Sequence, residues 1–220
     1  GAQQGLDLIS KIFINAGDKI LVEAPSYTGG LNAFASYQAR IISLPLDDDG
    51  LRVDLLGKQL EEIKNTSDAA WLPKFIYVIP NFHNPAGVTL SEERRSKLLV
   101  VAKKYGLLVL EDNPYGRLRF EGRSLKSLRA MDDSVVYLST FSKIFAPGVR
   151  LGWVIAPRPI LEKLIFAKQP ANLCFSSLTQ RIVEKYLRTN RWRDHLGELV
   201  KIYCERRDAM LQALEEFFPK

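Results

Sequence analysis

The sequence predicts an α/β fold, a three-layer αβα sandwich built around a mostly parallel sheet. Short apolar runs rich in β-branched residues alternate with segments of helical periodicity, which is the pattern of a sheet with helices packed on it. Most of these runs are continuously apolar, which is typical of strands covered on both faces. With 220 residues, 46% of them hydrophobic and 25% charged, the chain has the composition of a globular protein.

Six segments are predicted to be strands because each is a short run dominated by apolar residues. In chain order they are residues 19–24, 40–44, 74–79, 107–111, 135–139 and 151–156. Helices are predicted between them, at residues 3–15, 29–37, 53–65 and 91–105, and several more follow Arg158. Ser91 is expected to cap the helix that it begins, because Glu92 and Glu93 supply acidic side chains to the first turn.

From about Arg193 onward the pattern is that of one long helix. Its apolar side chains recur at helical spacing, at Leu196, Leu199, Val200, Tyr203, Met210, Leu211 and Leu214. We interpret this face as packing on the chain's own core; alternatively, the helix leads to a second domain. The chain begins at Gly1, without Met, and runs from helix-like sequence to helix-like sequence, so we expect a fragment of a longer protein.

Several classes of protein are excluded by composition. No apolar run approaches the length of a membrane span, and no secretory signal opens the chain. Cys174 and Cys204 cannot form a disulfide framework, and together with His83 and His195 they show no metal-ligand spacing. We therefore expect no metal and a reducing, cytoplasmic setting.

The net charge is +6 and the isoelectric point is about 9.3. Such a balance indicates a solvated basic surface or, alternatively, contact with nucleic acid. Nucleic-acid binding would favour basic residues interleaved with aromatic ones along one face. The dense basic run at residues 188–193 is short, so charge alone does not indicate that function.

Polar side chains follow four of the predicted strands. In open α/β sheets, ligands bind beyond the carboxyl ends of the strands, so these loops are expected to converge on one cleft. The cleft would gather an amide, a carboxylate, two phenols, an amine, a guanidinium and hydroxyls. The segments are residues 25–27, 80–87, 112–115 and 140–150.

This set of groups has a specific chemical use. A lysine in a Ser-rich loop can form a Schiff base with an aldehyde. A carboxylate can keep a ring nitrogen protonated, and an arginine, hydroxyls and helix N-terminal amides bind phosphate. An aldehyde, a ring nitrogen and a phosphate together describe pyridoxal 5'-phosphate, so we expect this cofactor.

Four motifs carry a resemblance to a known family. "SYTGG", "PNFHNPAG", "LEDNPYG" and "STFSKIFAPGVRLGW" occur in this order, each after a predicted strand. Over essentially the whole chain, the sequence resembles the large domain of fold-type I pyridoxal-phosphate enzymes, the class I/II aminotransferases. It is most similar to the 2-aminoadipate and aromatic aminotransferase branch, which is close to the aminotransferase-like domains of MocR-type transcription regulators. The resemblance implies a cofactor-binding large domain at residues 1–192, and a long helix at 193–220 leading toward a small domain absent from this chain.

The resemblance implies catalytic roles for three residues. Lys143 would form the Schiff base with the cofactor and then move a proton between the substrate Cα and the cofactor. Asp112 would pair with the ring nitrogen. Tyr115, together with Asn84, would hydrogen-bond the phenolic oxygen of the ring.

The remaining implied contacts surround the ring and its phosphate. Tyr27 would stack on one face of the ring, and Pro114 would lie near the other. His83, beside Asn84, is interpreted as a local packing residue. The phosphate would be bound by Ala2, Gln3, Thr140, Ser142 and Arg150.

An aminotransferase acting on an amino acid and a 2-oxo acid is the predicted function, and the resemblance implies a homodimer. The alternatives are an effector-sensing domain of a transcription regulator, with nucleic-acid contact only if a winged-helix domain precedes it, and a lyase or decarboxylase. In the family, the arginine that binds the substrate carboxylate and the N-terminal segment lie outside the part matched here. We therefore expect the 220 residues alone to show little transamination.

Overall fold

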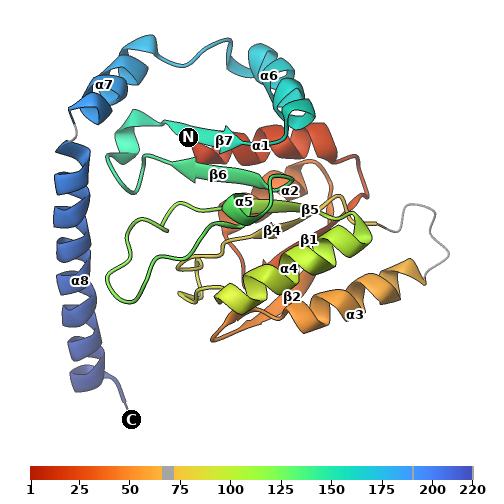
Figure 1. Ribbon diagram of the computed structural model, residues 1–220, viewed down its shortest axis with the longest axis horizontal. Coiled ribbons are helices and arrows are strands. Elements are labelled where there is room, and N and C mark those ends of the chain that lie inside the picture. The colour runs from red at the N-terminus through yellow and green to blue at the C-terminus, as the bar shows by residue number, and fades with distance from the viewer. Residues whose placement is uncertain (66–71, 190, 220) are drawn as a thin grey trace.

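A computed structural model describes residues 1–65, 72–189 and 191–219, and its centre is a seven-stranded sheet (Figure 1). The strand order is β3-β2-β1-β4-β5-β6-β7. The five strands from β2 to β6 in this order run parallel, whereas β3 and β7 pair antiparallel with their neighbours at the two edges. The mostly parallel sheet confirms the predicted fold class. The strands are β1 (Lys19–Ala24), β2 (Arg40–Asp47), β3 (Gly50–Leu51), β4 (Phe75–Val78), β5 (Leu108–Asp112), β6 (Val136–Thr140) and β7 (Gly152–Ile155).

Helices cover both faces of the sheet (Figure 1). On one face, α1 contacts α2, α6, β6 and β7; on the other, α4 contacts α3, α5 and β5. The layers are therefore the predicted helix, sheet and helix. The helices are α1 (Ala2–Phe13), α2 (Thr28–Ser36), α3 (Val53–Lys64), α4 (Glu92–Tyr105), α5 (Leu128–Met131), α6 (Arg158–Asn172), α7 (Ser177–Arg188) and α8 (Arg191–Phe217), with a 3-10 turn η1 (Pro147–Val149).

The hydrophobic core consists of two clusters, one on each side of the sheet. Along β1, Ile20 and Val22 belong to one cluster and Leu21 to the other, and the residues of β4 alternate in the same way. Because side chains of a strand point alternately to opposite faces, a strand buried on both sides must be apolar at every position. This explains the continuous apolar runs in the sequence.

Helix α4 begins and ends as its sequence predicts. The Ser91 side chain accepts a hydrogen bond from the backbone N–H of Arg94 at 3.4 Å, and Glu92 and Glu93 lie in the first turn. The helix ends at Gly106, whose φ of 66° is a left-handed conformation that favours glycine. Both helix ends are therefore specified locally.

Three short elements were not predicted. Strand β3 has two residues, α5 has four and η1 has three. None of them is long enough to repeat a helical or strand period, so hydrophobic patterning does not reveal them. Strand β2 also extends three residues beyond its predicted end, because Leu46 and Asp47 pair with β3.

The long C-terminal helix α8 is present, but the interpretation that its apolar face packs on the chain's own core is wrong. None of its described side chains is buried. In the first half of the helix the predicted apolar positions are half-buried, at Leu196, Leu199, Val200 and Tyr203, whereas Met210, Leu211 and Leu214 are exposed. Arg207 attaches the helix to the segment after β5, through an ion pair of 2.7 Å with Glu121. An amphipathic pattern specifies a face to be buried but not its partner; Lys220, the last residue of the predicted helix segment, lies outside the described residues.

Membrane-spanning helices and metal-binding clusters are both absent from the described residues. In the described part of the chain, no helix is both long and apolar enough to cross a membrane. Over the same residues, no group of three or more His, Cys, Asp or Glu side chains is arranged to bind a metal ion. Cys174 and Cys204 are free thiols.

Candidate active site

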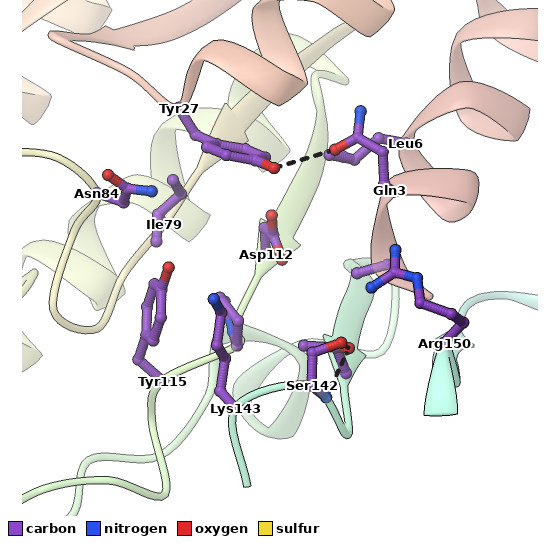
Figure 2. A pocket seen from close by; sticks show the side chains of 13 residues that line it. Gln3, Leu6, Tyr27, Ile79, Asn84, Asp112, Tyr115, Ser142, Lys143 and Arg150 are labelled. Carbon is purple, nitrogen blue, oxygen red and sulfur yellow. Dashed lines mark hydrogen bonds between the residues drawn. The ribbon is translucent and has the colours of Figure 1, made fainter. Parts of the chain in front are cut away.

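A pocket lies at the carboxyl-terminal edge of the parallel strands (Figure 2). All ten residues predicted from the sequence to bind the cofactor line it, although they span almost 150 positions of the chain. Pro114, Leu6 and Ile79 complete the lining. The ten are Ala2, Gln3, Tyr27, Asn84, Asp112, Tyr115, Thr140, Ser142, Lys143 and Arg150.

Sheet topology brings these residues together. Strands β1, β4, β5 and β6 are adjacent in the sheet and parallel, so the loops that follow them emerge at one edge. Asp112 and Thr140 are the last residues of β5 and β6, whereas Tyr27 follows β1 and Asn84 follows β4. Helix α1 supplies the remaining side of the pocket with its N-terminus.

Asp112 is a buried carboxyl group at the centre of the pocket lining (Figure 2). Its Oδ2 accepts a hydrogen bond of 2.8 Å from the hydroxyl of Tyr77 on β4. Its Oδ1 is buried and has no hydrogen-bond partner among the described residues. Burial raises the pKa of Asp112 to about 6, and the Tyr77 hydrogen bond opposes this rise. A buried, half-satisfied carboxylate is suited to bind a cation.

Tyr115 and Lys143 lie on the side of the pocket opposite Tyr27, and both point into it (Figure 2). The Lys143 Nζ is 5.9 Å from the centre of the Tyr115 ring. Burial raises the pKa of Tyr115, and the charge of Asp112 raises it further, whereas a hydrogen bond with Asn84 lowers it. The phenol therefore remains a hydrogen-bond donor beside an exposed amine.

Tyr27 is fixed by helix α1. Its hydroxyl donates to Gln3 Oε1 at 3.2 Å, and Gln3 Nε2 donates to the carbonyl of Gly29 at 2.6 Å. These two contacts orient the aromatic ring over the pocket, across from Lys143 (Figure 2).

A corner suited to an anion, called here the anion-binding corner, is formed where α1 begins by Ala2, Gln3, Thr140, Ser142 and Arg150. No side chain caps the N-terminus of α1, so its first backbone N–H groups are free of side-chain partners, and a helix N-terminus attracts negative charge. Thr140 and Ser142 add hydroxyls, 2.9 Å apart, and Arg150 adds a guanidinium. This corner is suited to bind a phosphate group.

Gly152 permits this corner to form. A Cβ at Gly152 would lie 2.8 Å from the Ala2 backbone nitrogen and 2.8 Å from the Ser139 carbonyl oxygen. Real Cβ atoms do not approach backbone so closely, so a side chain there would separate α1 from β6 and β7.

Comparison with protein families gives one result for almost the whole chain. The family model "Aminotransferase class I and II" matches residues 1–218. The chain belongs to the class I and II aminotransferase family.

Individual aminotransferases are similar to the chain in sequence and structure. It is 47% identical to aromatic-amino-acid aminotransferase 1 of Thermococcus litoralis, over 100% of this chain and 52% of that protein. The structure of Pyrococcus horikoshii kynurenine aminotransferase in complex with PMP superimposes with a TM-score of 0.96 at 44% identity, covering 100% of this chain and 54% of the other. The chain therefore spans about half the length of the relatives that it matches.

A relative of another kind also matches. The HTH-type transcriptional regulator YisV of Bacillus subtilis, described as uncharacterized, is 35% identical over 99% of this chain and 44% of its own length. The relatives of this chain therefore include both aminotransferases and a longer protein described as a transcriptional regulator.

The side chains in the pocket fit pyridoxal phosphate, the cofactor used in this aminotransferase family. Lys143 offers an amine for its aldehyde, and the α1 N-terminus with Arg150 offers a cradle for its phosphate. The strongest observation is the unpaired, buried Oδ1 of Asp112, which would otherwise be a costly orphan and which suits a protonated ring nitrogen. The individual roles of these residues stay predictions.

Two residues that support the pocket were not predicted from motifs. Tyr77 lies inside an apolar strand, where it looks like any core aromatic residue. Glu23 is buried in β1, and its Oε2 accepts from the backbone N–H of Ile79 at 2.7 Å and lies 3.1 Å from His83 Nε2. A carboxylate in an otherwise apolar strand was the available signal for Glu23.

The packing role expected of His83 agrees with its position. The side chain is buried, and its Nδ1 accepts from the backbone N–H of Ala86 at 3.4 Å. With Glu23 on the other ring nitrogen, His83 joins β1 to the loop that carries Asn84. His83 does not line the pocket.

Proposed function

We propose that this chain is the cofactor-binding part of a pyridoxal-phosphate-dependent aminotransferase, which moves an amino group between an amino acid and a 2-oxo acid. One observation carries the proposal: a buried carboxylate with an unpaired oxygen shares a pocket with a lysine amine and an uncapped helix N-terminus. These three groups complement the ring nitrogen, the aldehyde and the phosphate of one molecule.

When bound, pyridoxal phosphate supplies an aldehyde that reacts with amines and a ring that accepts electrons from the substrate Cα. Asp112 provides the negative charge that keeps the ring nitrogen protonated, because a nearby anion favours the charged form of a base. The carboxylate is buried and therefore screened little by water, so its effect on the ring is stronger than at a surface.

Lys143 Nζ is proposed to anchor the cofactor and afterwards to carry the substrate proton. Once the amino group of the substrate had displaced it from the cofactor, Nζ would be a free amine that could hold the proton leaving the substrate Cα and pass it on. Lys143 lies on a loop and is exposed, with its Nζ 5.9 Å from the centre of the Tyr115 ring.

Tyr115 and Asn84 are proposed to hydrogen-bond the phenolic oxygen of the cofactor, and Tyr27 to cover one face of its ring. The phosphate would be bound by the anion-binding corner of Ala2, Gln3, Thr140, Ser142 and Arg150. These contacts would position the reacting carbon. Positioning of this kind can lower a reaction barrier by up to roughly 7–11 kcal/mol.

Relatives support finer proposals about the longer protein. Aromatic amino acids and 2-aminoadipate are the donors to be tried first, because the relatives include an aromatic-amino-acid aminotransferase and a 2-aminoadipate transaminase. A homodimer and a cytoplasmic location are proposed with them; free Cys174 and Cys204 are compatible with a reducing compartment.

A second candidate is the effector-binding domain of a transcription regulator, which the 35% identity to YisV supports. Such a domain would bind the same cofactor in the same pocket. A winged-helix segment in the longer protein and specific DNA binding would favour this candidate, and turnover of amino donors would favour the enzyme.

The proposed function is tested by assaying the longer protein and residues 1–220 in parallel. Each is loaded with pyridoxal phosphate and given aromatic, aminoadipate and branched-chain donors, and the 2-oxo acid product is measured. We expect product from the longer protein and little from residues 1–220, because about half of each relative lies outside the match. Absence of product from the longer protein with every donor would contradict the enzymatic proposal.

A further inference from the structure

Tyr77 and Asp112 form a buried pair across two neighbouring strands. In the register of β4 and β5, Tyr77 lies opposite Leu110, so Asp112 is two residues further along and points to the same face. The Tyr77 side chain is fully buried, and its hydroxyl donates to Asp112 Oδ2 at 2.8 Å. Nothing in the proposed chemistry uses this hydroxyl directly.

Packing fixes the Tyr77 ring in place. The Phe34 ring meets it edge to face, with 5.2 Å between ring centres. Gly30, in the first turn of α2, approaches so closely that a Cβ there would lie 3.2 Å from the ring and 3.3 Å from its hydroxyl oxygen. With the ring fixed, the hydroxyl is directed at Asp112.

The hydroxyl acts on the carboxylate in two ways. A hydrogen bond to the ionised form lowers the pKa of Asp112, against the burial that raises it. The bond also occupies Oδ2, so Oδ1 is the oxygen left for another group. Burial raises the pKa of Tyr77 well above its usual value, so the hydroxyl stays a donor at physiological pH.

Among the described residues, Asp112 has no hydrogen-bonded side-chain partner other than Tyr77. Across the pocket, the cations are Lys143 and Arg150. The charge of Asp112 acts on Tyr115 and Tyr137, but neither of these described residues donates a hydrogen bond to it. Glu23 on β1 is a further anion, and its charge acts on Tyr77.

We propose that Tyr77 is a positioning residue that keeps Asp112 ionised before the cofactor binds and leaves Oδ1 free for the cofactor's ring nitrogen. The proposal rests on the proposed function, because it assumes that pyridoxal phosphate occupies the pocket. Tyr77 does not line the pocket, so its proposed effect on the cofactor passes through Asp112.

The test compares Tyr77→Phe with Tyr37→Phe in the longer protein. Tyr37 is the matched control. Its hydroxyl also donates to a carboxylate oxygen, Asp7 Oδ1, at 3.2 Å, but Tyr37 does not line the pocket. Carbon-13 NMR of the cofactor-free protein, labelled at aspartate and assigned with Asp112→Asn, gives the pKa of Asp112. We expect this pKa to rise in Tyr77→Phe and to stay unchanged in Tyr37→Phe.

Cofactor affinity is the second measurement. Tyr77→Phe should bind pyridoxal phosphate on the order of tenfold more weakly near pH 6, the size expected for one hydrogen bond to a charged group. The ratio to wild type should shrink as pH rises to about 9, because Asp112 is then ionised in both proteins. A merely structural defect would give a ratio independent of pH.

Three outcomes would overturn the proposal: an unchanged Asp112 pKa in Tyr77→Phe, an affinity ratio that does not vary with pH, or an Asp112 that is protonated at pH 8 in the wild-type, cofactor-free protein. The protonation state of Asp112 at pH 8 is measured in the wild-type protein, so this test can still overturn the proposal if Tyr77→Phe does not fold. If wild type never binds the cofactor at Lys143, the proposed function fails, while the pKa comparison still tests the link from Tyr77 to Asp112.

Discussion

Asp112 is predicted to weaken the fold that carries it. Burial raises its pKa from 3.8 to about 6, so folding favours the protonated carboxyl group. The resulting cost is absent below about pH 4 and complete above about pH 6, where it amounts to roughly 3 kcal/mol. Asp112→Asn should therefore stabilise the cofactor-free protein at pH 8 and not at pH 4.

Urea unfolding of both proteins at the two pH values measures this effect. Asp7→Asn is the control, since Asp7 also accepts from a tyrosine hydroxyl but lies outside the pocket. Equal stability of Asp112→Asn and wild type at pH 8 would contradict the prediction that the buried, ionised Asp112 destabilises the fold.

The same substitution should abolish most of the activity in the longer protein. An amide leaves the shape of the site nearly unchanged but removes the charge that keeps the ring nitrogen protonated. We expect the cofactor to bind on the order of tenfold more weakly but still to saturate the site, and kcat at saturating cofactor to fall by several orders of magnitude, each tenfold being about 1.4 kcal/mol of barrier. Steady-state kinetics checks this, and turnover near that of wild type would refute the role of Asp112.

At the scale of single residues, the sequence predicts the site residues whose polar side chains stand out at the ends of apolar strands. Asp112 and Lys143 are polar residues at strand ends within motifs, and topology alone then brings them into one pocket. Tyr77 was missed because an aromatic residue in an apolar strand is normally a core residue. Its partner is 35 positions away, and the hydrogen bond depends on the register of β4 with β5.

Among the elements, α1 matters most, because its N-terminus forms part of the anion-binding corner. Gly152→Ala should displace that N-terminus, since the added Cβ would meet backbone atoms at 2.8 Å. We expect weaker binding of pyridoxal phosphate, with a smaller effect on pyridoxal, which lacks the phosphate. Binding titrations with the two molecules measure the difference.

Gly57→Ala in α3 is the matched control for this prediction. A Cβ at Gly57 meets nothing within 4 Å, and alanine is favoured over glycine inside a helix by about 1 kcal/mol. It should leave affinity unchanged. Equal losses for pyridoxal and pyridoxal phosphate in Gly152→Ala would show that the corner does not bind the phosphate.

Longer elements were predictable because each repeats its period several times. Helix α4 also carries its own cap signals in Ser91 and Gly106. By contrast, α5 is one turn long, and its existence depends on a cap: Ser127 Oγ accepts from the backbone N–H of Ala130 at 3.1 Å. The packing of α8 was mispredicted because no pattern within a helix identifies what will cover it.

Considered as a whole molecule, the chain leaves apolar side chains uncovered on α6 and α7. They include Ile165, Phe166, Leu178 and Ile182, and Phe166 is 71% exposed. Contiguous exposed apolar surface is typical of interaction sites. We expect the longer protein to be a homodimer that uses this surface.

Light scattering at several concentrations measures the mass, and Phe166→Glu should weaken the association. Gln169→Glu is the control, because it adds the same charge at another exposed position of α6. A stable, active monomer would contradict the dimer, and a dimer insensitive to Phe166→Glu would place the interface elsewhere.

The central claim is that Lys143 is the residue that bonds to pyridoxal phosphate in this pocket. Borohydride treatment of the cofactor-loaded longer protein fixes the cofactor to whichever amine it has reacted with, and peptide mapping identifies that residue. We predict a single modified peptide containing Lys143, lost in Lys143→Ala and retained in Lys168→Ala, a lysine outside this pocket. Modification of any other lysine, with Lys143 unmodified, would contradict the account.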